Sequence, residues 1–458
     1  MCVVLTEIVV PHRALHAKRL EEPFASRGTR AVRVVVDPRI SGQDRDAVLT
    51  DLLTSVHFEV GVVGRGPDDT IQIHEPDSVG NRIPVTYGST WTYVWPLDNL
   101  LAFANARAEM YGVDSAELTE SLFLLSAVER WDGDFFVSDS DGLHTPAGGY
   151  RDVPVLTQEQ AVPVLALLLR SRELGRIPGD KRAGGGLAPM PLWSCYKVAT
   201  VGCLPEIRPW RLSLGTDGRQ SLVVREDGGD AIGLDLYDEW PIDGVTGRFE
   251  HALRARDRIL RAVLSGGGNE NEDLIAYELQ SLALQLSGAL DSAAVVVARQ
   301  LNLPDSVDRI SWSRKEPRRT MRHQWGVPTD LTTHWKHLTQ AMAVVRNRIH
   351  GSPIESVADF SSQEDDVFLA LPREARLRLQ VCFKDLGGDE AWGLRRDGLL
   401  DPWVFTEQAV SQTQIALGQI AAVATRTVVS DTNPEVWPWN AQTTSGTVRL
   451  FGLRLQPN

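Results

Sequence analysis

The segment covering residues 284–298 constrains the fold of this chain more than any other. It begins with a short apolar run, passes through small residues, and continues as an Ala/Val-rich stretch. This pattern predicts a buried strand, a tight loop and the start of a helix. The residues of the predicted loop and helix start are Ser287, Gly288, Ala289, Asp291 and Ser292.

A loop of this kind suits a phosphate or pyrophosphate group. The first backbone N–H groups of a helix have no partner within it, and the helix dipole attracts negative charge. Ser287 and Ser292 add hydroxyl donors, whereas Asp291 would cap the helix or hold a magnesium ion. The alternative is a strand–turn–helix connection that binds no ligand.

A second segment repeats the pattern. An apolar run over residues 377–383 leads into Gly387 and Gly388, and the acidic pair Asp389 and Glu390 follows. If the run is a strand, the acidic pair lies at its carboxyl end, where ligands bind in open parallel sheets. The alternative is that the acidic pair caps a helix.

Composition bounds the class of protein. A chain of 458 residues with 43% hydrophobic and 23% charged residues can form two or three packed domains. The formal net charge of −13 argues against general binding to nucleic acid or to an anionic membrane. We find no transmembrane segment and no signal peptide. Four cysteines without a CxxC pair indicate reduced thiols in a cytoplasmic protein.

The first half of the chain is predicted to be sheet-rich and the second half to alternate between helix and strand. Thr157 and Gln160 form a capping box that starts a helix within residues 154–173. The alternation from residue 240 to about 400 predicts a parallel α/β sheet. Other predicted strands are 31–36, 58–63, 91–95, 133–137, 210–214 and 221–225, and other predicted helices are 98–111, 115–128 and 243–264.

The motifs together resemble the asparagine synthetase-like superfamily. Ser-Gly-x-x-Asp-Ser is similar to the pyrophosphate loop of N-type ATP pyrophosphatases, with Ala289 in place of the second Gly. The Gly-Gly-Asp-Glu form is similar to that of lasso-peptide cyclases. Cys2 follows the first Met, as the glutaminase nucleophile does in that superfamily, although Val3 stands where the family has Gly.

This resemblance implies an α/β protein of two domains. Residues 1–235 would form an Ntn-like αββα sandwich, a degenerate class II glutamine amidotransferase-like domain. Residues 236–458 would form a parallel-sheet, ATP-pyrophosphatase-like synthetase domain. Strands ending near Leu286 and Phe383 would then lie side by side and share one ATP site.

The resemblance also implies a site that uses ATP and Mg²⁺. Asp291 and Asp389 would hold the metal, and Gly387 and Gly388 would join the loop at 287–292 in binding the nucleotide. Asp389, Glu390 and Arg395 are the candidate catalytic residues, and Glu316 is a further match to a strand-end acid. The chain departs from the family in having no lysine after Lys384.

The implied function is amide-bond formation through an acyl-adenylate, of the macrolactam or lasso-peptide type or a related natural-product ligation. Its partners would be a peptide or small carboxylate substrate, with a precursor peptide and its processing proteins. Two alternatives stay open. The chain is an inactive homologue that acts as a binding protein, or it is a glutamine-dependent amidotransferase that uses Cys2.

Overall fold

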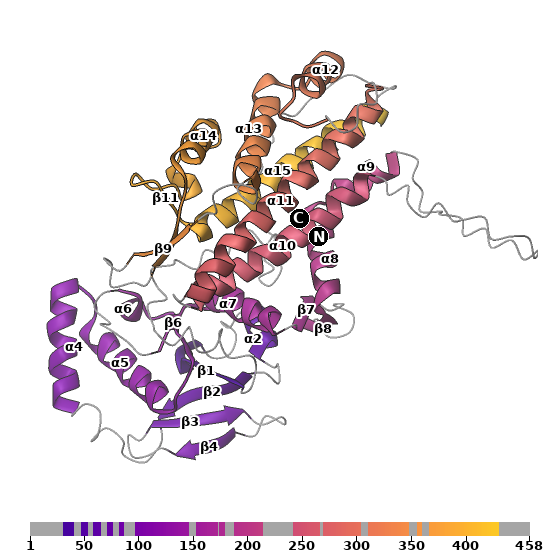
Figure 1. Cartoon of the computed structure of the whole chain (residues 1–458). Helices are drawn as coiled ribbons and strands as arrows, with labels where there is room; N and C mark the ends of the chain where they lie inside the picture. Colours follow the sequence, from indigo (N-terminus) through magenta and orange to yellow (C-terminus); the bar gives the residue numbers. More distant parts are fainter. Residues whose placement is uncertain are drawn as a thin grey trace, which may run out of the picture.

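The structure is a computed structural model in which a sheet-bearing half and a helical half pack together (Figure 1). We call residues 31–172 the sheet half and residues 241–429 the helical half. The described residues are 31–40, 47–53, 58–65, 71–76, 82–86, 97–145, 153–172, 174–178, 187–213, 241–265, 269–303, 310–347, 355–359 and 366–429. Cys2 and the predicted strands 91–95 and 221–225 lie outside them.

A six-stranded sheet organises the sheet half in the order β4-β3-β2-β1-β5-β6. The pairs β2-β1, β1-β5 and β5-β6 are parallel, and β3 and β4 continue the sheet in antiparallel pairing. The α/β class is therefore confirmed. The strands are β1 (Val32–Val36), β2 (Phe58–Arg65), β3 (Ile71–Pro76), β4 (Arg82–Thr86), β5 (Phe135–Val137) and β6 (Val155–Leu156).

Helices cover both faces of this sheet. Val34 and Val36 of β1 pack in one hydrophobic cluster with the first pair of helices, whereas Val35 packs in another cluster with the second pair. Successive strand residues point to opposite faces, which explains why β1 is apolar on both faces except at Arg33. The first pair is α2 (Ala47–Leu53) and α7 (Gln158–Ser171), and the second is α4 (Leu97–Tyr111) and α5 (Ser115–Arg130).

Local sequence signals explain several of these helices. The capping box is confirmed, because the Thr157 side chain accepts from the Gln160 backbone and the Gln160 side chain accepts in return. The predicted helices 98–111, 115–128 and 243–264 are also confirmed within two residues at each end. These segments carry clear start signals and apolar periodicity, which are the most reliable local predictors.

The helical half consists of long helices and one small antiparallel sheet (Figure 1). A hairpin of β7 (Leu174–Pro178) and β8 (Leu187–Pro191) precedes it, followed by α8 (Leu192–Cys203) and α9 (Ile207–Ser213). The remaining helices are α10 (Pro241–Leu264), α11 (Asn269–Gln300), α12 (Lys315–Trp325), α13 (Thr329–Arg346), α14 (Arg373–Lys384) and α15 (Pro402–Val429).

The prediction of a parallel sheet after residue 240 is wrong for the described residues. The strands there, β9 (Glu355–Asp359), β10 (Asp366–Ala370) and β11 (Leu399–Leu400), pair only antiparallel. Residues 210–214, predicted as a strand, fall mainly in α9. Short buried apolar runs do not distinguish a strand from a core helix, and here tertiary packing selects the helix.

The predicted two-domain architecture is not confirmed. Within the described part of residues 1–235 there is one six-stranded sheet and one hairpin, without a second large sheet to complete a sandwich. The predicted boundary at 235/236 falls outside the described residues. One hydrophobic cluster includes β1, α7, α10, α11 and α15, so the two halves share a core.

Helix α11 is the one candidate membrane span among the described residues. Its segment Asn271–Gln300 is long and apolar enough to cross a bilayer, but 61% of its most apolar window is buried in the fold. It packs against α10, α13 and α15. This is the position of a core helix, which passes the same test of length and composition.

A buried cluster of charged side chains joins the two halves. Asp257 of α10 binds Arg170 of α7, accepts from the Tyr196 hydroxyl of α8 at 2.8 Å, and accepts from Arg256 Nη2 at 2.9 Å. Burial alone would raise the pKa of Asp257, but the two guanidinium groups outweigh it and lower the pKa to about 2. Asp257 is therefore ionised at all physiological pH values.

Glu407 of α15 lies beside this cluster, with its Oε1 atom 3.7 Å from Arg256 Nε. Burial raises the pKa of Glu407 to about 7, although the Arg256 charge acts in the opposite direction. The ordinary value is 4.5. A raised folded-state pKa stabilises the fold fully below pH 4.5, and this stabilisation is lost as pH rises through 7.

We predict that the free energy of unfolding decreases between pH 5 and pH 7.5 and that Glu407→Gln removes much of this decrease. The contribution of one group is at most about 1.4 kcal/mol per pH unit. Urea unfolding of both proteins at the two pH values measures it. An equal decrease in the wild-type protein and in Glu407→Gln would contradict the assignment.

Candidate functional site

The predicted phosphate loop lies in the middle of a helix. Residues Ser287 to Ser292 all belong to α11, so the prediction of a strand, a loop and a helix start is wrong. Backbone N–H groups inside a helix donate to carbonyl groups four residues earlier and are not free for a phosphate. The helix continues through the segment because Leu, Ala and Val there are buried among neighbouring helices.

The small residues of this motif allow close packing between α10 and α11. A Cβ atom on Gly288 would lie 2.6 Å from Arg248 Nη1, and one on Gly244 would lie 3.0 Å from Ser292 Oγ. Ala289 is fully buried. The pattern that resembled a nucleotide loop is therefore explained by the approach of two helices.

The polar members of the motif also have structural partners. Ser287 Oγ donates to the Leu284 carbonyl at 3.1 Å and accepts from Arg346 Nη1 at 3.2 Å. Burial raises the pKa of Asp291, against a hydrogen bond from Ser311 and the Arg346 and Arg248 charges. Asp291 thus faces arginines of α10 and α13.

The second predicted segment ends a helix. The predicted strand at 377–383 is part of α14, so that prediction is wrong. Gly387 and Gly388 have φ values of 109° and 97°, and the Gly388 N–H donates to the Phe383 carbonyl at 2.7 Å. Positive φ is the common way to end a helix.

The acidic pair follows directly. Asp389 Oδ2 accepts from Gln380 Nε2 at 3.1 Å, and Glu390 begins the short 3₁₀ helix η8 (Glu390–Trp392). Trp392 stacks on Phe383 with ring centroids 4.8 Å apart. The segment is a compact turn held by a buried tryptophan.

The remaining predicted residues have separate partners. Arg395 pairs with Asp397 at 2.9 Å and lies over the Phe368 ring, and Glu316 pairs with Arg319 at 3.1 Å. Among the described residues, no three His, Cys, Asp or Glu side chains lie close enough to hold a metal ion. A metal bound by Asp291 and Asp389 stays a prediction.

We predict that Gly393→Ala destabilises the fold by at least about 2 kcal/mol. Gly393 has a φ of 72°, and its added Cβ would lie 2.9 Å from Val404 Cβ and 3.0 Å from the Asp401 carbonyl. A non-glycine residue at such a φ costs about 1–3 kcal/mol before any clash. Urea unfolding measures the loss.

The matched control is Gly247→Ala in α10, where an added Cβ meets nothing within 4 Å. It is expected to stabilise the fold by about 0.5–1 kcal/mol, because alanine is the better helix former. Similar effects of the two substitutions would contradict the role of the turn at Gly393.

A different pair of strand ends forms a pocket. Strand β1 has β2 as its neighbour on one edge and β5 on the other. The connection from β1 to β2 contains α2, and the later connection to β5 contains α4 and α5. The two connections pack on opposite faces of the sheet. The strand order reverses between β1 and β5, and a crevice for ligands forms at the carboxyl ends of strands at such a point.

Asp37 lies at this point, directly after β1. Its backbone N–H donates to the Val137 carbonyl at the end of β5 at 2.9 Å. Its carboxylate is 1% exposed, accepts from Ser138 Oγ at 2.6 Å, and pairs with Arg39 Nη2 at 2.6 Å. The hydrogen bond to Asp37 and its charge raise the pKa of Arg39, against burial.

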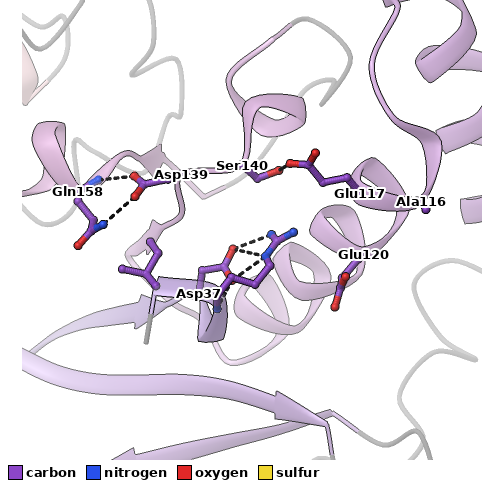
Figure 2. Close-up of a pocket in the computed structure, with 9 residues that line it drawn as sticks. Asp37, Ala116, Glu117, Glu120, Asp139, Ser140 and Gln158 are labelled. Atoms are coloured by element: carbon purple, nitrogen blue, oxygen red, sulfur yellow. Dashed lines mark hydrogen bonds and ion pairs between the residues drawn. The ribbon is translucent and has the colours of Figure 1, made fainter. Parts of the chain in front are cut away.

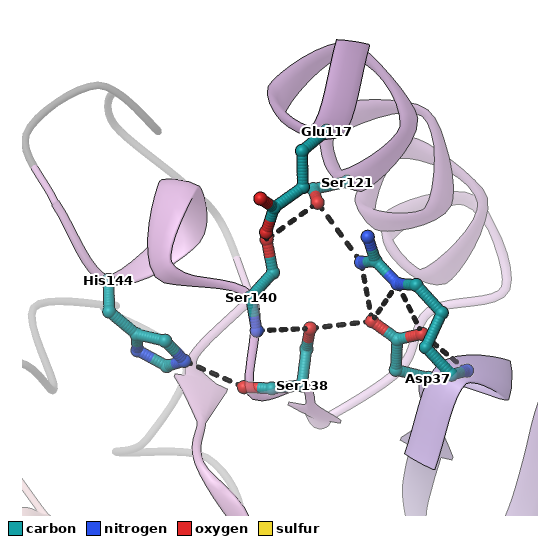
Figure 3. Close-up of polar contacts among 7 residues, drawn as sticks. Asp37, Glu117, Ser121, Ser138, Ser140 and His144 are labelled. Carbon is teal, nitrogen blue, oxygen red and sulfur yellow. Dashed lines mark hydrogen bonds and ion pairs between the residues drawn. The ribbon is translucent and has the colours of Figure 1, made fainter. Parts of the chain in front are cut away.

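A chain of hydrogen bonds connects Arg39 to a second carboxylate (Figure 3). Arg39 Nη2 donates to Ser121 Oγ at 3.0 Å, and Ser121 Oγ lies 2.8 Å from Ser140 Oγ. Ser140 Oγ donates to Glu117 Oε1 at 2.8 Å. Since Ser140 has one hydroxyl proton, Ser121 must donate to it, and the whole chain runs from arginine to Glu117.

His144 supports the same loop. Its Nε2 atom lies 2.7 Å from the Ser138 carbonyl and donates to it (Figure 3). The Ser140 N–H donates to Ser138 Oγ at 3.3 Å. These contacts hold residues 138–140 beside Asp37.

Asp139 also lines the pocket, and Gln158 at the start of α7 holds its carboxylate in place (Figure 2). Its two carboxylate oxygens accept from the Gln158 N–H at 2.9 Å and from Gln158 Nε2 at 2.7 Å. The pocket has a volume of about 540 Å³. Its lining residues are Asp37, Arg39, Ile40, Ala116, Glu117, Glu120, Asp139, Ser140 and Gln158.

The pocket is strongly acidic. Four carboxylates line it, from Asp37, Glu117, Glu120 and Asp139, against one cation, Arg39. The Arg39 side chain, whose guanidinium contacts both Asp37 and Ser121, is 34% exposed. Carboxylates in this number favour a divalent cation, although no three are within metal-binding reach of one another as arranged here.

The sequence contains a signal for this pocket that is separate from the two nucleotide-like motifs. Asp37 directly follows the apolar strand at 31–36, and Asp139 follows the strand predicted at 133–137. Ligands gather at the carboxyl ends of parallel strands, whereas the two segments that the motifs indicated are helical. Glu117 and Glu120 could not be foreseen, because their position depends on how α5 packs.

The pocket's geometry stands without support from known proteins. No protein-family model matches the chain, and the searches of curated proteins and of solved structures found no similar protein.

Proposed function

We propose that the pocket at the ends of β1 and β5 binds divalent cations and hydrolyses phosphoester bonds. The observation that carries this proposal is the convergence of Asp37 and Asp139, from adjacent parallel strands, with two glutamates of α5 on one cavity. Oxygen-rich acidic sites suit Mg²⁺, and such sites act on phosphoryl groups in phosphatases and nucleases.

Arg39 offsets part of the negative charge of the pocket. Its guanidinium lies next to the buried Asp37, where like charges of the neighbouring carboxylates repel one another. Cation binding requires Arg39 to leave Asp37, which its partial exposure permits. Asp37, Glu117, Glu120 and Asp139 are the residues that would hold the ion, although as arranged here no three of them lie within reach of one ion.

The chain's own groups then have distinct roles in hydrolysis. A carboxylate accepts a proton from the attacking water, whose oxygen forms a bond to phosphorus while the bond to the leaving oxygen breaks. A divalent cation held by these carboxylates would polarise the phosphoryl oxygens, and the proton taken from the water would pass to the leaving oxygen. Arg39, once released, offsets the charge on the phosphoryl group. The products are a phosphate monoester and an alcohol when the substrate is a diester.

We predict Mg²⁺- or Mn²⁺-dependent hydrolysis of bis(4-nitrophenyl) phosphate or of fluorescently labelled RNA or DNA. Asp37→Asn and Asp139→Asn should each lower kcat at least about 100-fold, because each removes a cation ligand without changing side-chain size. EDTA should abolish turnover. Release of nitrophenolate and gel analysis of the labelled strands measure these effects.

The control is Asp141→Asn, a neighbouring exposed aspartate of α6 (Asp141–His144) that does not line the pocket and should retain activity. Thermal unfolding shows whether Asp37→Asn still folds. If it does not, the exposed Asp139 gives an independent test. Absence of turnover with both metals, or full activity of Asp139→Asn, would sink the proposal.

ATP-dependent amide formation is a second proposal and rests on the motifs alone. An Ntn-like domain joined to a synthetase domain, a peptide or carboxylate substrate, and Cys2 as a glutaminase nucleophile belong to it. The segments that suggested it are a helix–helix contact and a helix-ending turn. An inactive homologue that acts as a binding protein is the accompanying alternative.

For this second proposal we expect exchange of labelled pyrophosphate into ATP only when the carboxylate substrate is present, because reversible adenylation requires it. Asp291→Ala and Asp389→Ala should weaken ATP binding in calorimetry, whereas Cys2→Ala should leave amide formation intact. No ATP binding at millimolar concentration favours the inactive homologue. Loss of activity in Cys2→Ala with rescue by ammonium favours the amidotransferase.

A further inference from the structure

Helix α12 presents a row of positive charges. Lys315, Arg318, Arg319 and Arg322 are spaced i, i+3, i+4 and i+7, which places them on one face of the helix. Pro317 and Met321 lie on another face and are buried. We call Lys315, Arg318, Arg319 and Arg322 the basic row.

Few carboxylates offset this charge. Arg319 pairs with Glu316 at 3.1 Å, and within the described ranges no carboxylate pairs with Lys315, Arg318 or Arg322. Arg318 Nε and Arg322 Nε each donate to a backbone carbonyl one turn earlier, which leaves their other N–H donors available. Burial and the Arg322 charge lower the pKa of Arg318.

The neighbouring helix adds to the positive field. Helix α13, which carries Lys336 and His337, packs against α12. Burial lowers the pKa of His337, and the Lys336 and Arg318 charges lower it further, against the Asp385 charge. Asp385 is the opposing carboxylate, 2.7 Å from His337 Nδ1. Residues 310–347 contain seven Lys or Arg and two Asp or Glu, within a chain of net charge −13.

The basic row destabilises α12 by electrostatic repulsion, and an anionic ligand would relieve that repulsion. Like charges three and four residues apart destabilise a helix, and here several such pairs share one face. A polyanion laid along the row would replace repulsion by attraction. Arginines bind phosphate oxygens through two N–H groups at once, so a phosphate backbone is the anion that best matches the row.

We propose that the basic row of α12 binds the phosphodiester backbone of a single-stranded nucleic acid. The row extends over about 10 Å of helix, a length that spans several successive phosphates. An anionic membrane is the poorer match, because the apolar residues of α12 are buried in the protein and do not face outward. The net charge of −13 is a property of the whole chain and does not describe the local charge of this surface.

This site is independent of the acidic pocket. Helix α12 lies at the end of the helical half remote from the six-stranded sheet (Figure 1). Binding to the row requires no metal, so it can be measured in EDTA, where the proposed hydrolysis is silent. Failure of one proposal therefore leaves the other unaffected.

Fluorescence anisotropy of a labelled 30-nucleotide single-stranded RNA, with a DNA strand of the same sequence, tests the proposal with the full-length protein in EDTA. Both strands should bind, and log K should fall with log [NaCl] with a slope of about −3 for four phosphate contacts. Arg318→Gln/Arg322→Gln should weaken binding at least tenfold at 50 mM NaCl and reduce the slope to about half.

Arg373→Gln/Arg378→Gln on α14 is the matched control, since both arginines are exposed and the substitution removes the same charge. It should bind as the wild-type protein does. Lys315→Gln/Arg319→Gln, at exposed positions, repeats the test if the first double variant has a lowered Tm. No binding at 50 mM NaCl, equal loss in the control, or binding only to anionic vesicles overturns the proposal.

Discussion

The parallel pairing of β1 with β5 is the constraint on which the candidate site depends. Val34 pairs with Phe135 and Val36 with Val137, so both strands end at the same edge. Asp37 and Asp139, separated by about a hundred residues in sequence, are brought to one pocket by this register. A shift of one residue would turn the apolar strand residues away from their helices. The hydrophobic packing of both sheet faces therefore also determines where the carboxylates lie.

The buried Asp257 connects that sheet to the rest of the molecule. Arg170 comes from α7, which packs on the sheet, and Asp257 and Arg256 come from α10 of the helical half. A substitution that removes Arg170 or Asp257 would therefore leave the other charge buried with a partner missing, which is strongly unfavourable. The acidic pocket and the basic row of α12 therefore belong to halves that share one hydrophobic core.

The sequence predicted the elements of the sheet half better than those of the helical half, for a physical reason. Residues 31–36 and the capping box at Thr157 carry local signals that tertiary packing reinforces. Around Gly288, by contrast, a glycine among serines suggested a turn, but its role is to make room for Arg248 of α10. A contact between segments distant in sequence determines the structure there, and a local sequence pattern cannot predict such a contact. For the same reason the sequence did not predict Glu117 as a site residue, since its position depends on the packing of α5.

Positive charge is concentrated on α12 and negative charge in the pocket, and this separation affects both proposals. A phosphate backbone is attracted by the basic row of α12 but repelled by the four carboxylates of the pocket. Arg39 alone cannot reverse the sign of the pocket, because it offsets one charge of four and does so while bound to Asp37. In the proposed function, a divalent cation would supply the missing positive charge at the carboxylates. If the proposed function holds, entry of a phosphoester into the pocket would follow or accompany cation binding, and displacement of the exposed Arg39 from Asp37 would couple the two events.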